Sequence, residues 1–557
     1  MSRVNLKKFF AELKRRRVYS VAVTYAVVAW LLIQVVTQVF PPFEIPNWAE
    51  RLVIIAIVVG FPIALVFAWI YDFTSHGIVR TDEAQPRVKA NATEASHSGE
   101  RSIAVLPFTD LSPAKDHAYF SDGVAEEILT ALAKVDGLRV AARRSSFWFR
   151  GKEAELPEIA QRLNVDHVLE GSVRRDGNRV RVAAELIDAR NGFTIWSETY
   201  EREMHGIFAV QDEITCSIVD ALKLKLEISP PPRSRSTHAY DLYLRGLFLS
   251  DKSTEETLRT SLEFFGRALD KDPRFARAWT GIAKSWLWLA DAYVKPVEAY
   301  SNVRQAALNA INIDDSEAEA HVYLAETKRI LDWDLRGAEA EYVRAFEIDS
   351  NSTTSNYFIA AFYAAIGERE KALTYLSRTA KIDPGSLWVS NFACEIYRYF
   401  GLIDEAMAAG ERSLQLDPTF LYSEPLLAAL YREMGRFDDA IALYKKSQDL
   451  SGRVPFGLAI TYAKMNRREE AREILKTACA SRGSYTPGDA IAHVHVMLEE
   501  YEEAMRELAR AYDEHSSSLH FIGIAPEFAP LRPNKRFVSI VKEIGLEPQK
   551  VFAVTAA

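Results

Sequence analysis

Two long runs of apolar residues open the chain, and mostly polar stretches follow them. Residues 18–40 and 52–71 carry no charged side chain, and each run is long enough to cross a ~30 Å hydrocarbon core as a helix. Seven Lys or Arg against one acid precede the first run, which favours a cytoplasmic amino terminus under the positive-inside rule. We therefore expect a membrane-anchored, multi-pass protein of the bacterial inner membrane, with two transmembrane helices and its soluble domains in the cytoplasm.

Shorter patterns begin after residues 77–100, a polar and aperiodic stretch that predicts a tether. The apolar run at 103–108 is typical of a buried strand, whereas residues 124–135 place apolar side chains on one face of a helix. A short strand at 138–141 and a helix at 159–163 complete the first half of a small α/β (α+β) domain.

The second half of this domain predicts three antiparallel strands. Asp-Gly and Asn-Gly pairs favour type I′ turns, because both central residues of that turn have positive φ. The strand-like runs 168–173, 180–186 and 193–199 are separated by Asp176-Gly177 and Asn191-Gly192. We expect a three-stranded meander.

Arginine is concentrated at the tip of the first hairpin. One interpretation is an anion or partner site, and the other is a solvated hairpin end whose charges pair with local acids such as Asp176. The four side chains are Arg174, Arg175, Arg179 and Arg181. Glu126 and Glu127 are interpreted as first-turn charges that match the helix dipole, and not as a catalytic pair.

The motifs of this region resemble a known family. They are IAVLPF, AYFSDGVAEEI, ARRSSF, VDHVLEGSVRRDGNRVRVAAELIDARNGFTIWSETYERE and IFAVQDEI. Together they are similar to the TolB amino-terminal-like domain, related to the FlgO-type fold, which many bacterial proteins fuse to tetratricopeptide repeats. Members of that family carry adenylate cyclase domains, winged-helix DNA-binding domains or membrane segments at their amino termini. Only the membrane segments have a counterpart here, so the resemblance implies a recognition module without those activities.

The carboxyl half repeats with a period near the ~34 residues of tetratricopeptide helix pairs. A small residue opens each second helix, at Ala372, Ala406, Ala440, Ala471 and Ala504. Glycine lies five residues earlier, where the inter-helix turn is expected, at Gly367, Gly401 and Gly435. Residues 526–537 break the pattern and predict a cap. Such pairs stack into an all-α superhelix whose concave groove faces a protein or peptide partner.

Groove residues are nominated from their positions in the first helix of each repeat. Tyr, Trp and Arg are the residue types that anchor interfaces, because they combine a large contact area with a polar group. The alternative for each is packing within the superhelix or exposure to solvent. The candidates are Tyr357, Trp388, Asn391, Arg398, Tyr399, Tyr422 and Arg432.

Charge and motif content narrow the function further. The net charge is −8 and the first seventeen residues contribute +6, so the remainder carries −14, which argues against a nucleic-acid partner. Three widely spaced cysteines give no disulfide framework, and no GxxxxGK[ST], GxGxxG, HExxH or GxSxG motif occurs. His493 and His495 are interpreted as repeat-surface histidines. We therefore expect no cofactor, no metal site and no catalytic residues.

The sequence predicts a non-catalytic, membrane-embedded protein–protein interaction scaffold or signalling adaptor. One alternative is a regulatory subunit of a separately encoded signalling enzyme such as an adenylate cyclase, and another is an envelope assembly factor if the soluble part is periplasmic. The oligomeric state and the identity of the partner stay open. The expected organisation is a basic tail (1–17), a transmembrane hairpin (18–74), a linker (75–100), the α/β domain (101–228), a second linker (229–238), the repeat array (239–525) and a C-terminal cap (526–557).

Overall fold

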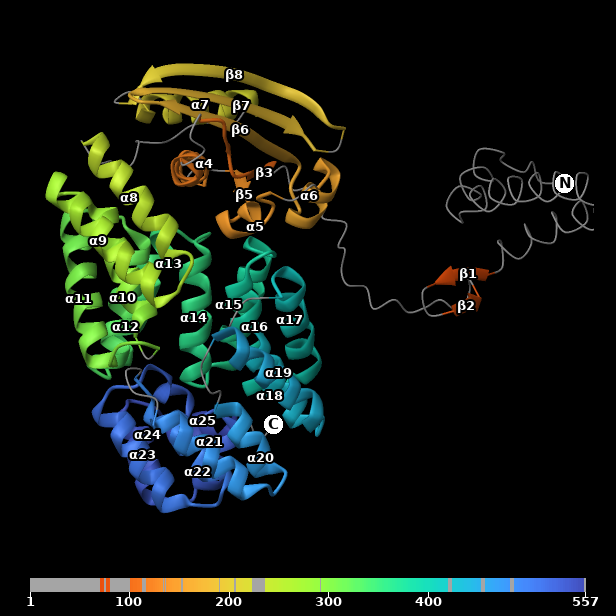
Figure 1. Cartoon of the computed structure of the whole chain (residues 1–557), viewed down its shortest axis with the longest axis vertical. Helices are drawn as coiled ribbons and strands as arrows, with labels where there is room; N and C mark the ends of the chain where they lie inside the picture. Colours follow the sequence, from red (N-terminus) through yellow and green to blue (C-terminus); the bar gives the residue numbers. More distant parts are fainter. Residues whose placement is uncertain are drawn as a thin grey trace, which may run out of the picture. The chain divides into compact units, whose positions relative to one another are not determined.

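The computed structural model describes residues 71–74, 77–80 and 101–554, with gaps at 113–116, 134, 136, 152–153, 190, 205–206, 223–235, 291, 419–422, 452–455 and 481–484. The chain divides into two units, Met1–Ser98 and Gly99–Ala557. The described residues of the first unit form an antiparallel pair of strands, β1 (Tyr71–Thr74) and β2 (Gly77–Arg80). The second unit contains all the other described elements (Figure 1).

The predicted membrane anchor is corrected by this structure. No helix among the described residues is long and apolar enough to span a bilayer. The runs 18–40 and 52–71 lie outside the described residues, except for Tyr71, which begins β1. The fold class with two transmembrane helices, and the inner-membrane location that depended on it, are therefore not retained. The physical reason is that an uncharged run of this length permits a membrane span without requiring one.

A mixed sheet forms the first part of the second unit. Strand β3 (Arg101–Val105) pairs in parallel with β5 (Leu138–Val140) and with β6 (His167–Asp176). Strands β6, β7 (Arg179–Asp188) and β8 (Phe193–Glu203) form the antiparallel meander that the sequence predicts. The strand order is β5-β3-β6-β7-β8, and the two-residue strand β4 (Thr109–Asp110) pairs with β6.

The first hairpin turn differs from the predicted type. Asp176 pairs with Arg179, so the loop consists of Gly177 and Asn178. Of these two residues only Gly177 has a positive φ, +58°, which matches the type II′ pattern with glycine first. The prediction of Asp176 as a central turn residue was wrong because the strand continues through it.

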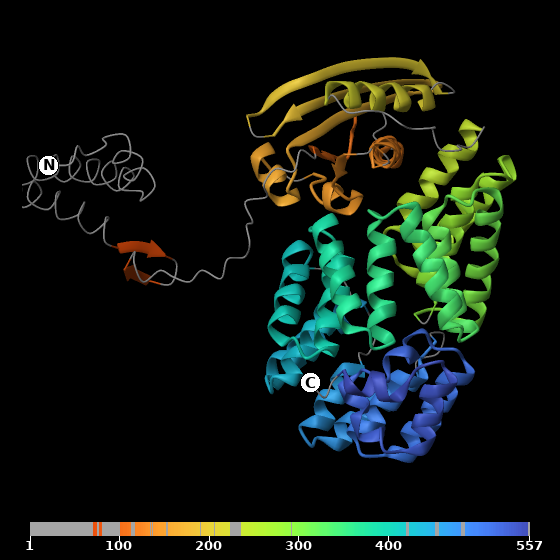
Figure 2. The ribbon, with the colours of Figure 1, turned by 180° about the vertical axis from the view of Figure 1, so that it is seen from behind.

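Helices cover both faces of this sheet unequally (Figure 2). Helices α4 (Ala118–Leu132) and α7 (Ile207–Ala221) share a buried apolar cluster with the inner side chains of β3, β6 and β7. On the other face, α6 (Leu156–Leu163) packs on Ala104 and Val168. Helix α5 (Arg143–Phe147) lies near β3. The described helices thus leave the far part of the β6–β7–β8 outer face uncovered.

Helix α4 begins six residues before its predicted start at residue 124. Its N-cap is His117, and Gly123 lies inside it with a buried position. A Cβ at Gly123 would overlap the side chain of Leu244, which belongs to α8 (Thr237–Ser250). Glycine is therefore present because two helices approach closely, and not because a helix starts there.

The second part is the repeat array, in which consecutive helices pair as the 34-residue period predicts. The fourth residue of each second helix is fully buried at all five predicted alanines. The helices after α8 are α9 (Glu255–Lys271), α10 (Ala276–Leu289), α11 (Pro296–Ile313), α12 (Ala318–Leu331), α13 (Leu335–Ile348), α14 (Thr353–Ala365), α15 (Arg369–Ile382), α16 (Leu387–Tyr399), α17 (Ile403–Leu416), α18 (Ser423–Glu433), α19 (Phe437–Ser451), α20 (Phe456–Lys464), α21 (Arg468–Ala480), α22 (Gly488–Met497) and α23 (Tyr501–Asp513).

The turn inside most repeats uses one left-handed residue. Its position lies five residues before the buried fourth residue of the second helix, where glycine adopts positive φ without a steric cost. The residues found there are Ser253, Trp333, Gly367, Gly401, Gly435, Asn466 and Glu499. The turn geometry is thus kept even where the glycine signal is missing from the sequence.

The segment predicted as a cap reaches back across the array. It contains the 3-10 helix η4 (Pro526–Leu531), followed by α24 (Lys535–Glu543) and α25 (Pro548–Ala553). The 3-10 helix η3 (Ser517–Phe521) directly precedes the predicted cap and belongs to the same carboxyl-terminal segment. The Arg329 side chain of α12 donates a hydrogen bond to the Ser517 carbonyl, 3.3 Å away. Lys550 forms an ion pair with Glu368. One hydrophobic cluster consequently joins α10–α16 to the carboxyl end.

Gly123→Ala tests the close approach of α4 and α8. Replacing glycine in a helix normally stabilises it by about 0.5–1 kcal/mol, and Gly266→Ala, where no neighbouring atom lies within 4 Å of the added Cβ, should show that gain. At Gly123 the overlap with Leu244 should reverse the sign and cost about 1–3 kcal/mol. Thermal unfolding of both variants measures the difference. Equal stabilisation by both would contradict the packing.

Candidate functional site

The nominated groove residues that the structure describes are buried. Tyr422 lies outside the described residues. The relative exposure of the other six is between 4% and 8%, at Tyr357, Trp388, Asn391, Arg398, Tyr399 and Arg432. Their surroundings are the chain's own side chains, so no partner can contact most of their surface in this conformation.

Aromatic rings close part of the inner side. Trp388 of α16 stacks on Trp288 of α10, with ring centroids 4.3 Å apart. Tyr357 of α14 stacks on Phe392 at 4.8 Å. Asn391 donates from Nδ2 to the Ser413 hydroxyl at 3.1 Å. The first contact joins helices a hundred residues apart, and the other two join helices of the same repeat or of neighbouring repeats. Packing within the superhelix is therefore the observed role of these three candidates.

Arg398 and Arg432 converge on one carboxylate. Glu527 of η4 lies 2.5 Å from Nη1 of Arg398 and 3.3 Å from Nη2 of Arg432. Arg398 also pairs with Glu433 at 2.7 Å, and Arg432 donates to the Tyr444 hydroxyl at 3.0 Å. Buried charges require such partners, because leaving one unpaired costs several kcal/mol. The acidic residue of the carboxyl segment therefore holds that segment inside the array.

The charges of this cluster set the protonation of its neighbours. Burial alone raises the pKa of Glu527, but the attraction of Arg398 and Arg432 outweighs burial and holds that pKa well below its ordinary value. Burial lowers the pKa of His493 to about 4, so this imidazole is neutral at pH 7. The cluster thus keeps Glu527 ionised over the physiological range.

A cavity of about 190 Å³ adjoins the cluster. The residues that line this cavity include Arg398, Tyr399, His493, Phe521, Glu527 and Phe528. His495 instead pairs with Glu500, at 2.8 Å. Residues two apart on a helix do not face each other, so His493 and His495 are not placed to share one ligand. Both are half-buried rather than fully on the repeat surface.

The four arginines of the hairpin tip have separate environments. Arg174, Arg179 and Arg181 are exposed. Arg175 is half-buried and lies 2.6 Å from Asp241 of α8, which also accepts a hydrogen bond from the Tyr119 hydroxyl at 2.9 Å. Arg175 therefore fastens the sheet to the first repeat, whereas the other three remain open to a partner.

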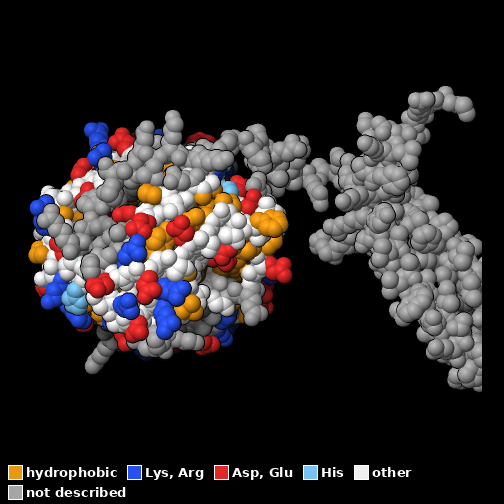
Figure 3. All heavy atoms as spheres, turned by 90° about the horizontal axis from the view of Figure 1, so that it is seen from above, with side chains coloured by type: hydrophobic (Ala, Val, Ile, Leu, Met, Phe, Trp, Pro, Cys, Tyr) orange, Lys and Arg blue, Asp and Glu red, His pale blue; other side chains and the backbone are white. Residues whose placement is uncertain are grey.

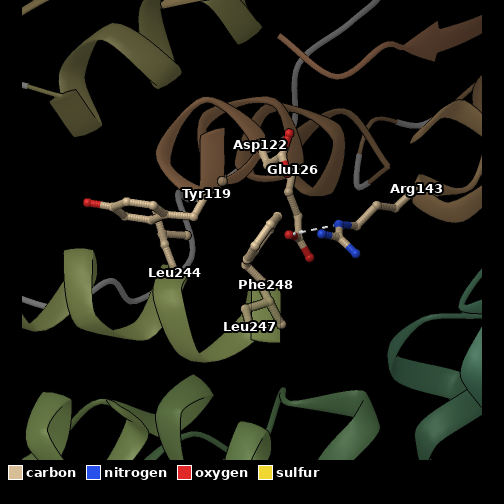
Figure 4. Close-up of a pocket in the computed structure, with 8 residues that line it drawn as sticks. Tyr119, Asp122, Glu126, Arg143, Leu244, Leu247 and Phe248 are labelled. Carbon is tan, nitrogen blue, oxygen red and sulfur yellow. Dashed lines mark ion pairs between the residues drawn. The ribbon is translucent and has the colours of Figure 1, made fainter. Parts of the chain in front are cut away.

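A group of paired and mostly half-buried charges lies at the junction between α4 and the first repeats (Figure 4). Glu126 is 2.9 Å from Arg143, which also pairs with Asp251, and Lys284 is 2.8 Å from the same Asp251. Glu127 lies 2.5 Å from Arg277 of α10. Both glutamates lie mid-helix, so their interpretation as first-turn charges was wrong.

Burial has a measurable effect on Glu126. It raises the pKa of this carboxyl to about 7, against the opposing attraction of Arg143. The hydrophobic side chains of Leu247 and Phe248 line the same small pocket. The raised pKa predicts that the stability of this junction depends on pH up to about neutrality.

Sequence reasoning did not find Asp241, Asp251 or Glu527. Each has a basic partner far away in the chain, and pairing over such separations leaves no local pattern, although Asp241 also pairs with Arg245 one helical turn away. The one available signal was Glu527, an acidic residue within the otherwise apolar segment of residues 526–531.

Comparisons with known proteins give separate matches for the α/β part and for the repeat array. Residues 426–452 match the family described as a tetratricopeptide repeat. The array consists of tetratricopeptide repeats. Residues 99–217 match the family described as the second domain of HilA/YgeH-like transcriptional regulators. The resemblance to a TolB amino-terminal-like domain is not shown by these matches and stays a prediction.

One relative by sequence is the "Putative adenylate cyclase 3" of Rhizobium meliloti (strain 1021), 40% identical over 255 residues. The match covers 43% of this chain and 42% of that protein, so the chain spans less than half of its relative. Among solved structures, Cut9–Hcn1 of the APC/C has a TM-score of 0.37 and 15% identity, covering 53% of this chain and 52% of that one. PilF of Pseudomonas aeruginosa has a TM-score of 0.31 and 16% identity, covering 42% and 98%. Such low scores carry no argument about function.

Glu527→Gln tests the buried cluster. Without the carboxylate charge, Arg398 and Arg432 lose their shared partner, and we expect a loss of roughly 3 kcal/mol in the free energy of unfolding. The control is Glu470→Gln, which breaks an exposed pair with Arg467 and should change the free energy of unfolding far less, because water and salt screen exposed pairs. Urea unfolding of the two variants is the measurement. Losses of similar size would show that Glu527 does not hold the carboxyl segment.

Glu126→Gln tests the titration at the junction. Because the pKa of Glu126 is raised from 4.5 to about 7, the folded state binds more protons than the unfolded state within that window. Its contribution to stability is therefore present below pH 4.5 and is lost as pH rises towards 7. The variant should show a weaker decline of the melting temperature over this range than the parent. Glu469→Gln, at a side chain 88% exposed, should retain the parental profile.

Proposed function

We propose that this chain is a non-catalytic scaffold in bacterial signalling, which binds a protein or peptide partner through its tetratricopeptide repeats. The repeats support a binding role, because stacked helix pairs present extended surfaces to partners. The observation that carries the proposal is the shared core of the α/β part and the first repeats. A ligand or partner on one part would change the free energy of the other through this core.

We propose a partner-binding site on the repeats that is smaller than an open groove along the whole array. Most nominated residues are packed against the chain itself, but Arg398 and Tyr399 border the cavity of about 190 Å³. We propose this cavity as the place where an anchoring side chain of the partner inserts. The other nominated residues are proposed to contact a partner only if the helices of the array rearrange. They are Tyr357, Trp388, Asn391, Tyr422 and Arg432. Arg398→Ala is expected to disturb the fold of the array, because Arg398 is buried and paired.

A second candidate is regulation of an adenylate cyclase. The partial match to a protein named putative adenylate cyclase favours this class of signalling. The exposed hairpin arginines Arg174, Arg179 and Arg181 remain proposed contacts for acidic side chains, whether of another protein or of a second copy of the chain. The division into a TolB-like α/β domain at 101–228, an array at 239–525 and a cap at 526–557 is retained as part of this proposal.

An assay for cyclic AMP formation distinguishes a non-catalytic scaffold from an adenylate cyclase. Purified full chain, incubated with ATP and Mg²⁺ or Mn²⁺, should form no cyclic AMP above a heat-denatured control. Deletion of the chain in its own cells should nevertheless change the cyclic AMP level, and re-expression should restore it, if regulation is its role. Turnover of ATP that scales with the concentration of purified chain would refute the non-catalytic proposal. An unchanged cyclic AMP level would refute the regulatory one alone.

A further inference from the structure

The outer face of the β6–β7–β8 meander carries its charges in bands that run across the strands. Side chains directly opposite one another in an antiparallel sheet lie on the same face, so the register defines three rungs. The acidic rung is Glu170, Glu185 and Ser197. The small rung is Ser172, Ala183 and Thr199. The basic rung is Arg174, Arg181 and Glu201.

Two of these rungs place like charges face to face. Glu170 is directly opposite Glu185, and Arg174 is directly opposite Arg181. Like charges in this position destabilise a sheet. Burial and the charge of Glu185 together raise the pKa of Glu170. On the other side of Arg181, Glu201 lies directly opposite it and partly offsets the repulsion in the basic rung. A complementary surface would relieve the acidic pair and the remaining repulsion of the basic pair.

This face is also available for contact. The side chains of Arg174, Arg181, Ser197, Thr199 and Glu201 are exposed, and those of Glu170, Ser172, Ala183 and Glu185 are half-buried. Those of Val173, Val180, Val182 and Tyr200 point to the opposite face and join the core with α4 and α7. Viewed from the side on which β8 lies in Figure 1, acidic, basic and hydrophobic side chains are interspersed (Figure 3). The rungs thus belong to the part of the sheet that the described helices leave uncovered.

The order of the rungs is self-complementary. Successive rungs lie two residues apart along each strand, about 7 Å, so the acidic and basic rungs flank the small rung at equal distances. A twofold axis along the small rung would turn a second copy face to face with the first. Each strand would then cross its own counterpart in the opposite direction, with Glu170 facing Arg174, Glu185 facing Arg181 and Ser197 facing Glu201 of the other copy.

We propose that this face is the interface of a homodimer of the chain. The interface is isologous, as a twofold contact requires, and the small side chains on the axis permit close approach of the two sheets. Charge complementarity favours a second copy as the partner, because the reversed order of the same surface places the acidic rung opposite the basic rung and the basic rung opposite the acidic rung. The exposed Ile195, at 42%, lies beside the acidic rung and adds apolar contact at the edge.

The chemistry of the rungs predicts an association that depends on salt. Exposed Glu–Arg pairs contribute modestly and are screened as ionic strength rises. Raising NaCl from about 0.05 M to about 0.5 M shortens the Debye length to a few ångströms and should weaken the dimer at least about tenfold. Sedimentation of the purified full chain at both salt concentrations measures this change.

Charge exchange identifies the interface. Arg174→Glu with Arg181→Glu makes both rungs acidic, and Glu170→Arg with Glu185→Arg makes both basic. Each variant alone should be monomeric, whereas an equimolar mixture should form a heterodimer, since each rung then faces its opposite. The matched control is Glu198→Arg with Arg202→Glu, two exposed residues of β8 on the opposite face, which should dimerise like the parent.

Cross-linking provides an independent readout that does not require charge changes. Thr199 lies on the proposed axis and would face itself, so Thr199→Cys should cross-link through a short bismaleimide, because packed sheets are ~10 Å apart. Ser197→Cys, displaced from the axis, should not. Both are made in a chain whose exposed Cys216 and Cys479 are replaced by Ser.

The proposal is overturned if the parent chain stays monomeric at low salt. It is also overturned if the charge variants fail to form a heterodimer and Thr199→Cys does not cross-link. Binding of an acidic polymer to the parent without self-association would assign the arginines to an anionic partner and would overturn it as well. None of these outcomes depends on cyclic AMP or on the cavity near Glu527, so the scaffold proposal is tested separately.

Discussion

Helix α4 is packed against the sheet on one side and against helix α8 of the first repeat on another. Glycine at position 123 removes the side chain that would keep α8 away. A single hydrophobic core therefore continues from β3, β6 and β7 into the first repeats. The α/β part and the array behave as one body because separating them would expose this core to water.

The charges around α4 follow from the same contact. Once the helices approach closely, the carboxylates of Glu126, Glu127 and Asp241 leave water, and each is found with a basic partner from another element. Such pairs add little net stability, but an unpaired buried charge is strongly destabilising. They thus favour this one arrangement of the two parts. Arg175 belongs to this set although it follows directly after the exposed Arg174.

A similar constraint acts inside the superhelix. A repeat array normally leaves its concave side for partners, but here the carboxyl segment occupies part of it, with Glu527 between Arg398 and Arg432. The stacking of Trp288 on Trp388 closes another part. A partner can consequently bind at the remaining cavity or on the outside of the molecule, including the sheet face opposite α4 and α7.

Sequence patterns within one repeat or one hairpin were sufficient to predict the helix pairs and the meander. The spacing of Ala372, Ala406 and Ala440 predicts the helix pairs, because a small residue is needed wherever two helices touch once per repeat. Alternating side chains and glycine-containing turns predict the meander of β6, β7 and β8. Trp333, Asn466 and Glu499 adopt the left-handed turn without glycine, because tertiary packing outweighs the cost of that conformation, about 1–2 kcal/mol per residue.

The sequence by itself determined the period of the repeats, the order of the strands within the meander and the residue types available for recognition. Only the tertiary structure decided which of those residues are free. Trp388 and Arg398 have the composition of a binding groove, yet each contacts a residue that is about a hundred or more positions away in the chain. Burial and pairing over such separations depend on how the superhelix curves, and curvature accumulates from small rotations at every repeat.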